Sequence, residues 1–460
     1  MSISTIPSDL IPQLRETVHG RVIGPDDTDY DAARAVVYGG IDQRPAVIAR
    51  VAHPGDIATV IATARDTGLP LAVRSGGHSG AGHGSVEGGI VIDVRELDGL
   101  DIDPVARTAW AGSGLTAGAY TSAAAEHGLA TGFGDTGSVG LGGLITGGGV
   151  GYLVRKHGLT IDNLLAAEIV TADGQVHMVD EDHEPDLFWA IRGGGGNFGV
   201  VTRFKLRLHV LDGVVGGMLI QPATAESIAG FIAAAEAAPE ELSTIANVMN
   251  CPPMPFVAEE HHGKLVIFGM LAYAGDADRG ERALAPFRAL AEPLADMTKP
   301  IPYPEMFPPE DPDYHPTAVS TTMFIDRVDL PVAETIMEHL AASDASLRAA
   351  QLRVLGGGEV AEPPEIRPDQ QPVLLGCPRR KPVAHRIEIR LVEQPRIEQL
   401  DLMRIEMRRC AAEVLEVADA GPVQRDAADR QRSAGLLAGS VGARRGKKMK
   451  TSIPRAISDP

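Results

Sequence analysis

The chain has few cysteines, and their spacing excludes a disulfide framework and the common zinc motifs. Cys251, Cys377 and Cys410 are the only three in a chain of 460 residues. They form no Cys-x-x-Cys pair and no Cys/His cluster with zinc-ligand spacing. An odd number of widely spaced cysteines is typical of a reducing compartment, so we expect a cytoplasmic protein.

Membrane-spanning runs and clusters of basic residues are also missing. The uncharged stretch 137–154 is long enough to suggest a membrane helix, but eight of its 18 residues are glycine, which strongly disfavours a helix. The N-terminal residues lack the basic start and apolar core of a signal peptide. A net charge of −19 disfavours a nucleic-acid partner. We therefore expect neither membrane nor nucleic acid as a partner.

Aromatic residues are absent from the last quarter of the chain. All 19 Phe, Trp and Tyr residues stand at or before Phe324. Residues 351–460 carry a net charge of +5, against −24 for the rest. Because a core completed without any aromatic side chain is unusual, this ending differs in kind from the sequence before it.

Strands and helices alternate over the first three quarters of the chain. Apolar runs bounded by glycine and proline predict the strands, and capping residues such as Thr116 with stop residues such as Gly68 and Gly128 delimit the helices. The predicted strands are 46–52, 69–74, 88–94, 213–221, 243–250 and 264–275, the predicted helices are 55–68, 116–128, 225–238, 277–293 and 331–342, and a hairpin is predicted at 164–179. The length predicts two or three domains.

A glycine-rich loop with two histidines, His78 and His83, follows the strand at 69–74. Glycine lets backbone N–H groups approach a pyrophosphate closely, and Arg74 at the strand end could add positive charge. The loop contains a Gly-x-Gly-x-Gly run, but a predicted strand follows it instead of a helix. A nicotinamide-dependent dehydrogenase, which requires that helix, is therefore a weak alternative. The two histidines lack further ligands, so we expect no metal.

Two more glycine clusters follow, at 136–165 and 186–208. Three such clusters within about 130 residues suggest one extended ligand that lies along much backbone. With the motifs RSGGHS, GGLITGGGVGYLVRKHGLTIDN and DLFWAIRGGGGNFGVVT, residues 45–208 resemble the FAD-linked oxidases of the p-cresol methylhydroxylase (PCMH) and vanillyl-alcohol oxidase superfamily. Within it they are most similar to the berberine-bridge-enzyme-like branch, which includes 6-hydroxy-D-nicotine oxidase. The resemblance continues to about residue 358.

The resemblance implies an α+β fold. It comprises a two-lobed PCMH-type FAD-binding domain and a substrate domain with an antiparallel sheet backed by helices. We expect an N-terminal segment at 1–40, the FAD-binding domain at 41–211, the substrate domain at 212–358 and a divergent C-terminal region at 359–460.

The resemblance also implies the residues that bind FAD. The histidine of the first loop, here His78, would be bonded to the 8-methyl carbon of the flavin. Thr136 stands where some relatives have a second linking cysteine, so we expect a single link. The residues assigned to FAD are Arg74, Ser75, Gly76, Gly77, His78, Ser79, Gly80, Thr136, Gly137, Gly140, Gly142, Gly143, Gly147, Gly148, Gly149, Gly151, Asn197, Gly199 and Val200. Asp186, Phe188 and Trp189 are expected to form the structural turn and core before the third cluster.

The function implied is hydride transfer from a C–H beside an alcohol or amine of a small molecule to FAD, with dioxygen as the expected acceptor. The sequence assigns no catalytic base. Tyr273, Tyr303 and Tyr314 could line a pocket, but core or loop packing is the preferred interpretation.

The family's closing segment has no match after Gly358. One hypothesis is a shifted reading frame, which leaves a flavin-binding protein without turnover; the other is a divergent ending that works.

Overall fold

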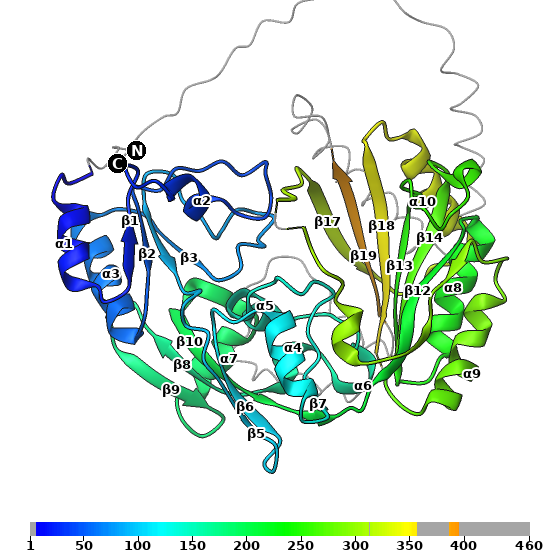
Figure 1. Cartoon of the computed structure of the whole chain (residues 1–460), viewed down its shortest axis with the longest axis horizontal. Coiled ribbons are helices and arrows are strands. Elements are labelled where there is room, and N and C mark those ends of the chain that lie inside the picture. Colours follow the sequence, from blue (N-terminus) through cyan, green and yellow to red (C-terminus); the bar gives the residue numbers. More distant parts are fainter. Residues whose placement is uncertain (1–5, 312, 357–385, 395–460) are drawn as a thin grey trace, which may run out of the picture. The chain divides into compact units, whose positions relative to one another are not determined.

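The computed structural model describes residues 6–311, 313–356 and 386–394. Within them the chain forms an α+β fold built on a four-stranded sheet, a five-stranded sheet and a larger antiparallel sheet (Figure 1). The predicted fold class is confirmed. The predictions for the ending fall mainly on 357–385 and 395–460, which lie outside the described residues.

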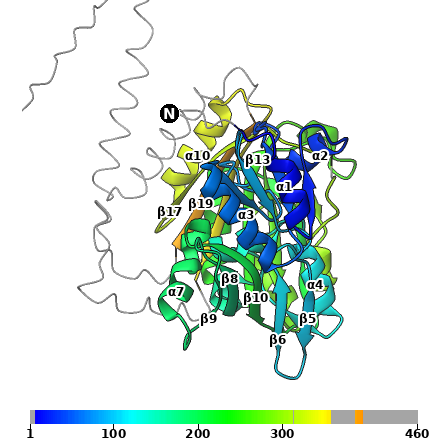
Figure 2. The same ribbon diagram turned by 90° about the vertical axis from the view of Figure 1, so that its left-hand side faces the viewer.

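The first sheet has the strand order β1-β2-β4-β3, with β2, β4 and β3 parallel and β1 antiparallel to β2. Alternate side chains of its strands pack on opposite faces, against α1 and α3 on one face and α2 on the other. Figure 2 shows α1 and α3 side by side. The elements are α1 (Leu10–Thr17), β1 (Arg21–Ile23), α2 (Tyr30–Arg34), β2 (Val47–Arg50), α3 (Pro54–Thr67), β3 (Leu71–Arg74) and β4 (Ile90–Asp93).

The predicted boundaries of this region agree with the structure. α3 ends at Gly68, whose φ of 67° is the left-handed conformation that glycine adopts without strain. No helix follows the loop after β3, because β4 comes next. The nicotinamide alternative therefore lacks its helix. β1 pairs with β2, so the segment 1–40 contributes a strand to this first sheet.

The second sheet is antiparallel, with the order β5-β6-β10-β8-β9. The predicted hairpin is confirmed as β8 and β9, and α4 begins at the predicted cap, where Thr116 Oγ1 accepts the Ala119 N–H. Glycine-rich α5 and α7 were not predicted as helices. The elements are β5 (Leu100–Asp103), β6 (Thr108–Gly112), α4 (Ala117–Ala125), α5 (Leu141–Gly147), β8 (Leu164–Val170), β9 (Val176–Asp180), α7 (Pro185–Gly194) and β10 (Val200–Arg207).

The large sheet has the order β15-β12-β14-β13-β18-β19-β17, with β16 beside β12. One face packs against α8, α9 and α10 and forms the largest apolar cluster of the described residues (Figure 1). The strands are β12 (Val214–Pro222), β13 (Leu242–Asn250), β14 (Leu265–Tyr273), β15 (Ala295–Asp296), β16 (Lys299–Ile301), β17 (Val319–Ile325), β18 (Leu347–Leu355) and β19 (Arg386–Gln394), and the helices are α8 (Ala225–Ala237), α9 (Ala277–Arg288) and α10 (Leu330–Ala342).

β19 lies in a region for which the sequence predicts neither a helix nor a strand. It pairs with β18 on one side and β17 on the other. Ile387, Ile389 and Leu391 are buried in the helix-covered core, with the alternation expected of a strand that is covered on one face.

The remaining elements connect these sheets. They are the short strands β7 (Leu129–Ala130) and β11 (His209–Val210), helix α6 (Val154–His157) and the 3₁₀ turns η1 (Thr160–Asn163), η2 (Gly195–Asn197), η3 (Glu259–His261) and η4 (Tyr303–Met306). No helix among the described residues is long and apolar enough to span a bilayer.

Arg155 of α6 joins the second sheet's region to the large sheet. Its buried guanidinium donates to the carbonyl oxygens of Ala235 (2.5 Å), Ala238 (3.0 Å) and Leu242 (3.2 Å). The first two oxygens lie at the C-terminus of α8, where the helix leaves carbonyls without intrahelical partners and carries partial negative charge. A cation therefore satisfies these groups well.

We expect Arg155→Met to lower the free energy of unfolding by about 3 kcal/mol, because buried carbonyls lose a charged donor at once. Urea unfolding followed by circular dichroism measures this loss. Arg282→Met, at an exposed position of α9, should change stability by less than about 0.5 kcal/mol. Equal unfolding midpoints for the two variants would contradict the role of Arg155.

Candidate functional site

A cavity of about 870 Å³ lies where the three glycine-rich segments meet. This volume is within the usual range of small-molecule and cofactor sites. The predicted FAD residues that line it are Arg74, Ser75, Gly76, Gly77, His78, Ser79, Gly140, Gly142, Gly143, Asn197, Gly199 and Val200. The segments thus come together although more than 100 residues separate the first from the last.

The first loop and the start of α5 are held against each other by backbone contacts. A Cβ on Gly140 would lie 2.0 Å from Ser75 Oγ and 2.3 Å from the Gly76 nitrogen. Ser75 Oγ donates to the carbonyl of Ser113 at 2.6 Å, and the Gly142 N–H donates to the same carbonyl at 2.9 Å. Gly76 and Gly140 are therefore required by protein packing.

Other glycines of the cavity have no such packing reason. A Cβ on Gly143 or Gly196 would meet no protein atom beyond its own chain neighbours within 4 Å. Gly193 (φ 108°) and Gly195 (φ 56°) have the same open space, but their positive φ by itself favours glycine. Gly143 lies inside α5, where glycine is less stable than alanine by about 0.5–1 kcal/mol. Because glycine has no side chain, a bound group in the cavity could lie directly against the main chain at these positions.

Ser113 at the end of β6 adds an unpaired polar atom. Its side chain is fully buried, it lines the cavity, and its Oγ has no hydrogen-bond partner among the described residues. A buried hydroxyl without a partner is costly, so a ligand atom is the expected partner. Ser113 cannot be predicted from the sequence, because nothing in the short run after β6 sets it apart from a turn serine.

Arg74 does not supply free positive charge to the cavity. Its guanidinium is 1% exposed and donates to Asp93 Oδ2 at 3.0 Å and to the Ala33 carbonyl at 2.5 Å. Burial lowers the pKa of Arg74, and the neighbouring Asp93 carboxylate opposes that shift. The expectation of added charge is corrected: the cation ties β3 to β4 and to α2.

His78 lines the cavity with a half-buried ring. Its Nε2 lies 3.0 Å from Ser138 Oγ, and Ser138 in turn contacts the carboxylate of Glu310. Burial lowers the pKa of His78, while Glu310 acts in the opposite direction. The neutral imidazole is therefore favoured, and it is the nucleophilic form.

The other predicted FAD residues do not line this cavity. They are Gly80, Thr136, Gly137, Gly147, Gly148, Gly149 and Gly151. Two of them are glycine for internal packing, since a Cβ would lie 2.1 Å from Thr160 Oγ1 at Gly149 and 1.3 Å from the Phe133 carbonyl at Gly151. Their assignment to FAD stays a prediction.

The burial of the aromatic residues differs in part from what the sequence predicts. Phe188 is buried, as predicted, but Trp189 is 61% exposed, so its expected place in the core is wrong. α7 turns these adjacent side chains in different directions, and only one faces the sheet. Tyr273 and Tyr303 are buried in apolar clusters, and Tyr314 is exposed.

A polar face of the large sheet lies opposite its helix-covered face. On it, Gln351 Nε2 donates to Asn247 Oδ1 at 2.9 Å, and Arg353 Nη2 donates to Gln351 Oε1 at 2.8 Å. Arg353 also donates to Asp135 Oδ2 and to the Val150 carbonyl, each at 2.7 Å. The polar face therefore contacts the chain that surrounds the second glycine cluster.

Glu388 belongs to the same face, directly across from Arg353 in the β18–β19 register. Its Oε2 is buried and has no hydrogen-bond partner among the described residues. A buried carboxylate oxygen without a partner is costly, which makes Glu388 a candidate functional residue. Glu388 cannot be predicted from the sequence, because the strand that carries it has no family motif.

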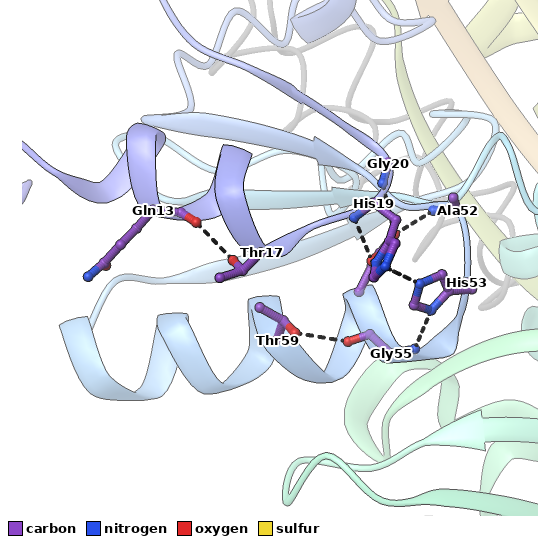
Figure 3. A network of polar contacts seen from close by, with 9 residues as sticks. Gln13, Thr17, His19, Gly20, Ala52, His53, Gly55 and Thr59 are labelled. Atoms are coloured by element: carbon purple, nitrogen blue, oxygen red, sulfur yellow. Dashed lines mark hydrogen bonds and ion pairs between the residues drawn. The ribbon is translucent and has the colours of Figure 1, made fainter.

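A second cluster of possible ligand atoms, at His19, His53 and Asp56, lies at the N-terminus of α3. Figure 3 labels two of these residues, His19 and His53. Asp56 accepts the backbone N–H groups of His19, Gly20 and Ala52. His53 Nδ1 accepts the Gly55 N–H at 3.0 Å, so the proton of the neutral ring is on Nε2, the atom that faces the cluster. This cluster is explained by hydrogen bonds that join the N-terminal segment to α3.

Comparison with known proteins agrees with this geometry. The FAD binding domain family matches residues 45–180. (R)-6-hydroxynicotine oxidase of Paenarthrobacter nicotinovorans is 36% identical over 281 residues, which cover 61% of this chain and 60% of that protein. The chain spans less than two thirds of the length of the curated relatives it matches first.

The structural comparisons cover more of the chain than the sequence comparisons do. 6-Hydroxy-D-nicotine oxidase from Arthrobacter nicotinovorans superposes with a TM-score of 0.72 at 29% identity, covering 90% of this chain and 88% of that chain. The berberine-bridge-enzyme-like protein 1 of Physcomitrella patens also has a TM-score of 0.72, at 18% identity, covering 89% and 88%. The second comparison bears on the fold alone.

The two kinds of cavity glycine predict opposite effects of an added methyl group. Gly140→Ala should lower the free energy of unfolding by about 2 kcal/mol or more, because its Cβ meets backbone that cannot move away. Gly143→Ala should raise it by about 0.5–1 kcal/mol through helix propensity. Urea unfolding after removal of any bound ligand compares the two. A loss of stability in Gly143→Ala would show that protein packing, and not a ligand, requires that glycine.

Proposed function

The chain belongs to the FAD-linked oxidases of the p-cresol methylhydroxylase and vanillyl-alcohol oxidase superfamily, and from this premise we propose that it is an FAD-dependent oxidoreductase of small molecules. Its resemblance is to the berberine-bridge-enzyme-like branch. The observation that carries the proposal is the bare glycine backbone around the cavity, with His78 in its lining. Bound FAD would accept a hydride from a C–H beside an alcohol or amine and pass two electrons to dioxygen.

The residues of the cavity suit this cofactor. The backbone of Ser75–Ser79 and of Gly140–Gly143 would hold the pyrophosphate, and the unpaired Ser113 hydroxyl would take a polar atom of FAD. Asn197, Gly199 and Val200 would lie along the flavin end. We propose one covalent bond, from His78 to the 8-methyl carbon, because the Thr136 hydroxyl is a much weaker nucleophile than a thiolate.

The substrate site of this proposal is the polar face of the large sheet. Arg353 would hold Gln351 in place on this face, and Glu388 would accept the O–H or N–H proton as the C–H bond breaks. The relative's name makes 6-hydroxynicotine the first candidate substrate, within a class of small amines and alcohols.

We expect acid precipitation of the purified protein to give a yellow pellet and an intact mass raised by one FAD. His78→Ala should move the yellow colour into the supernatant. His83→Ala is the matched control, because His83 lines the same cavity in the same loop and should keep the link. A colourless wild-type pellet above a yellow supernatant would contradict the covalent bond, and no yellow colour anywhere would contradict FAD binding.

We expect turnover with 6-hydroxynicotine, or with a member of a panel of amines and alcohols, to release hydrogen peroxide. Glu388→Gln should keep the flavin and lower kcat by about 100-fold, the effect of losing a general base. Flavin loading without peroxide from any substrate would favour the alternative, a flavin-binding protein without turnover. Unchanged kcat in Glu388→Gln would remove Glu388 from the proton transfer.

A further inference from the structure

Two residues, Ser138 and Glu310, lie one behind the other next to Nε2 of the His78 ring. Nε2 lies 3.0 Å from Ser138 Oγ, which contacts Glu310 Oε2. The Ser138 N–H donates to the other oxygen of the same carboxylate at 2.9 Å. The Glu310 carboxylate thus accepts both the backbone N–H and the hydroxyl proton of Ser138, and Ser138 Oγ can serve His78 only as an acceptor, through its lone pairs.

These contacts determine which ring nitrogen carries the proton. An ionised carboxylate only accepts hydrogen bonds, so the single hydroxyl proton of Ser138 points to Glu310. Ser138 Oγ then accepts, and His78 Nε2 must donate. A neutral imidazole has one N–H, so the lone pair is on Nδ1. Nδ1 has no hydrogen-bond partner in the part of the chain that the structure describes.

The contacts of Ser138 and Glu310 also bear on where a proton goes when His78 becomes attached to FAD. When Nδ1 forms a bond to the 8-methyl carbon of FAD, that carbon loses one hydrogen, and the imidazole must lose its Nε2 proton to remain neutral. Dioxygen takes up two electrons and two protons and becomes hydrogen peroxide, which balances the reaction. The proton that has to leave is therefore the one that faces Ser138 and, behind it, the Glu310 carboxylate.

We propose that Glu310, acting through Ser138, is the positioning residue for flavin attachment: it presents the Nδ1 lone pair of His78 and receives the Nε2 proton. The inference rests on the proposed covalent bond through His78. The lowered pKa of His78, caused chiefly by burial, supports it because the ring starts neutral.

Glu310 comes from the chain after η4 and not from the glycine-rich segments. The same connection is anchored nearby, where the Gly39 N–H donates to the Pro316 carbonyl at 3.1 Å and His315 Nδ1 lies 3.3 Å from the Val37 carbonyl. A Cβ added to Gly137 would lie 3.5 Å from both Glu310 Oε1 and Phe307 Cβ. The attachment of FAD to His78 would then require the chain segment after η4, which carries Glu310, to lie next to the first glycine-rich loop.

The test measures the rate of attachment separately from FAD affinity. Flavin-free protein, produced in cells starved of riboflavin, is mixed with FAD under air, and the covalent fraction is followed by intact mass. Glu310→Gln should slow attachment by about 100-fold, the lower end of the range for a lost general base, because Ser138 and Glu310 are exposed to solvent. The Kd for FAD before attachment should stay within about twofold, and Glu310→Asp should restore part of the rate.

Glu305→Gln is the matched control, since it removes an exposed carboxylate just before the same connection, with no side-chain hydrogen bond or ion pair among the described residues. It should attach FAD at the wild-type rate. Nitrogen-15 NMR of the flavin-free protein gives a readout independent of attachment. Wild-type His78 should be the Nε2–H tautomer, and Glu310→Gln should shift it toward Nδ1–H, because an amide can donate to Ser138.

The outcomes separate the two proposals. A wild-type protein that binds FAD and never forms the link overturns both the covalent bond and this inference. A wild-type protein that forms the link at the same rate as Glu310→Gln overturns the role of Glu310 alone. A slow Glu310→Gln variant whose Kd has risen in proportion would assign Glu310 to FAD binding instead and would also overturn the inference.

Discussion

The backbone of Gly76 lies so close to that of Gly140 that neither residue has room for a Cβ. One belongs to the loop after the first sheet, and the other begins α5 beside the second sheet. Everything at the cavity depends on this contact: it places His78 beside Ser138, directs two donors to the Ser113 carbonyl, and leaves the backbone of both segments facing a shared space. Larger side chains would separate the segments and open the site.

The buried cations of the protein serve its framework. Arg74 is neutralised by Asp93 beneath the first loop, Arg155 satisfies carbonyls at the end of α8, and Arg353 joins the polar face to Asp135. Arg74 is the one Arg or Lys among the described residues that line the cavity. A pyrophosphate there would be held mainly by backbone N–H groups, which explains why this site needs many glycines and little positive charge.

The local elements were predictable where capping and periodicity act alone. α3, α4 and the β8–β9 hairpin follow from Gly68, Thr116 and a turn at 171–175, because these signals involve only neighbouring residues. α5 was not predicted, since its glycines disfavour a helix and packing against the second sheet compensates. Trp189 was misplaced for a similar reason: its neighbour Phe188 occupies the buried side of α7.

The sequence by itself determined the alternation of strands and helices over the first three quarters of the chain and the three glycine-rich segments, because each is written in a short run of residues; the α+β class and the role of His78 came from the family resemblance. Tertiary structure decided which glycines face empty space and which face protein, paired Arg74 with Asp93, left Ser113 Oγ and Glu388 Oε2 without partners, and brought Glu310 to within two contacts of His78. The physical reason is separation along the chain: Ser138 and Glu310 stand 172 residues apart, and no local pattern records a contact that only the folded chain creates.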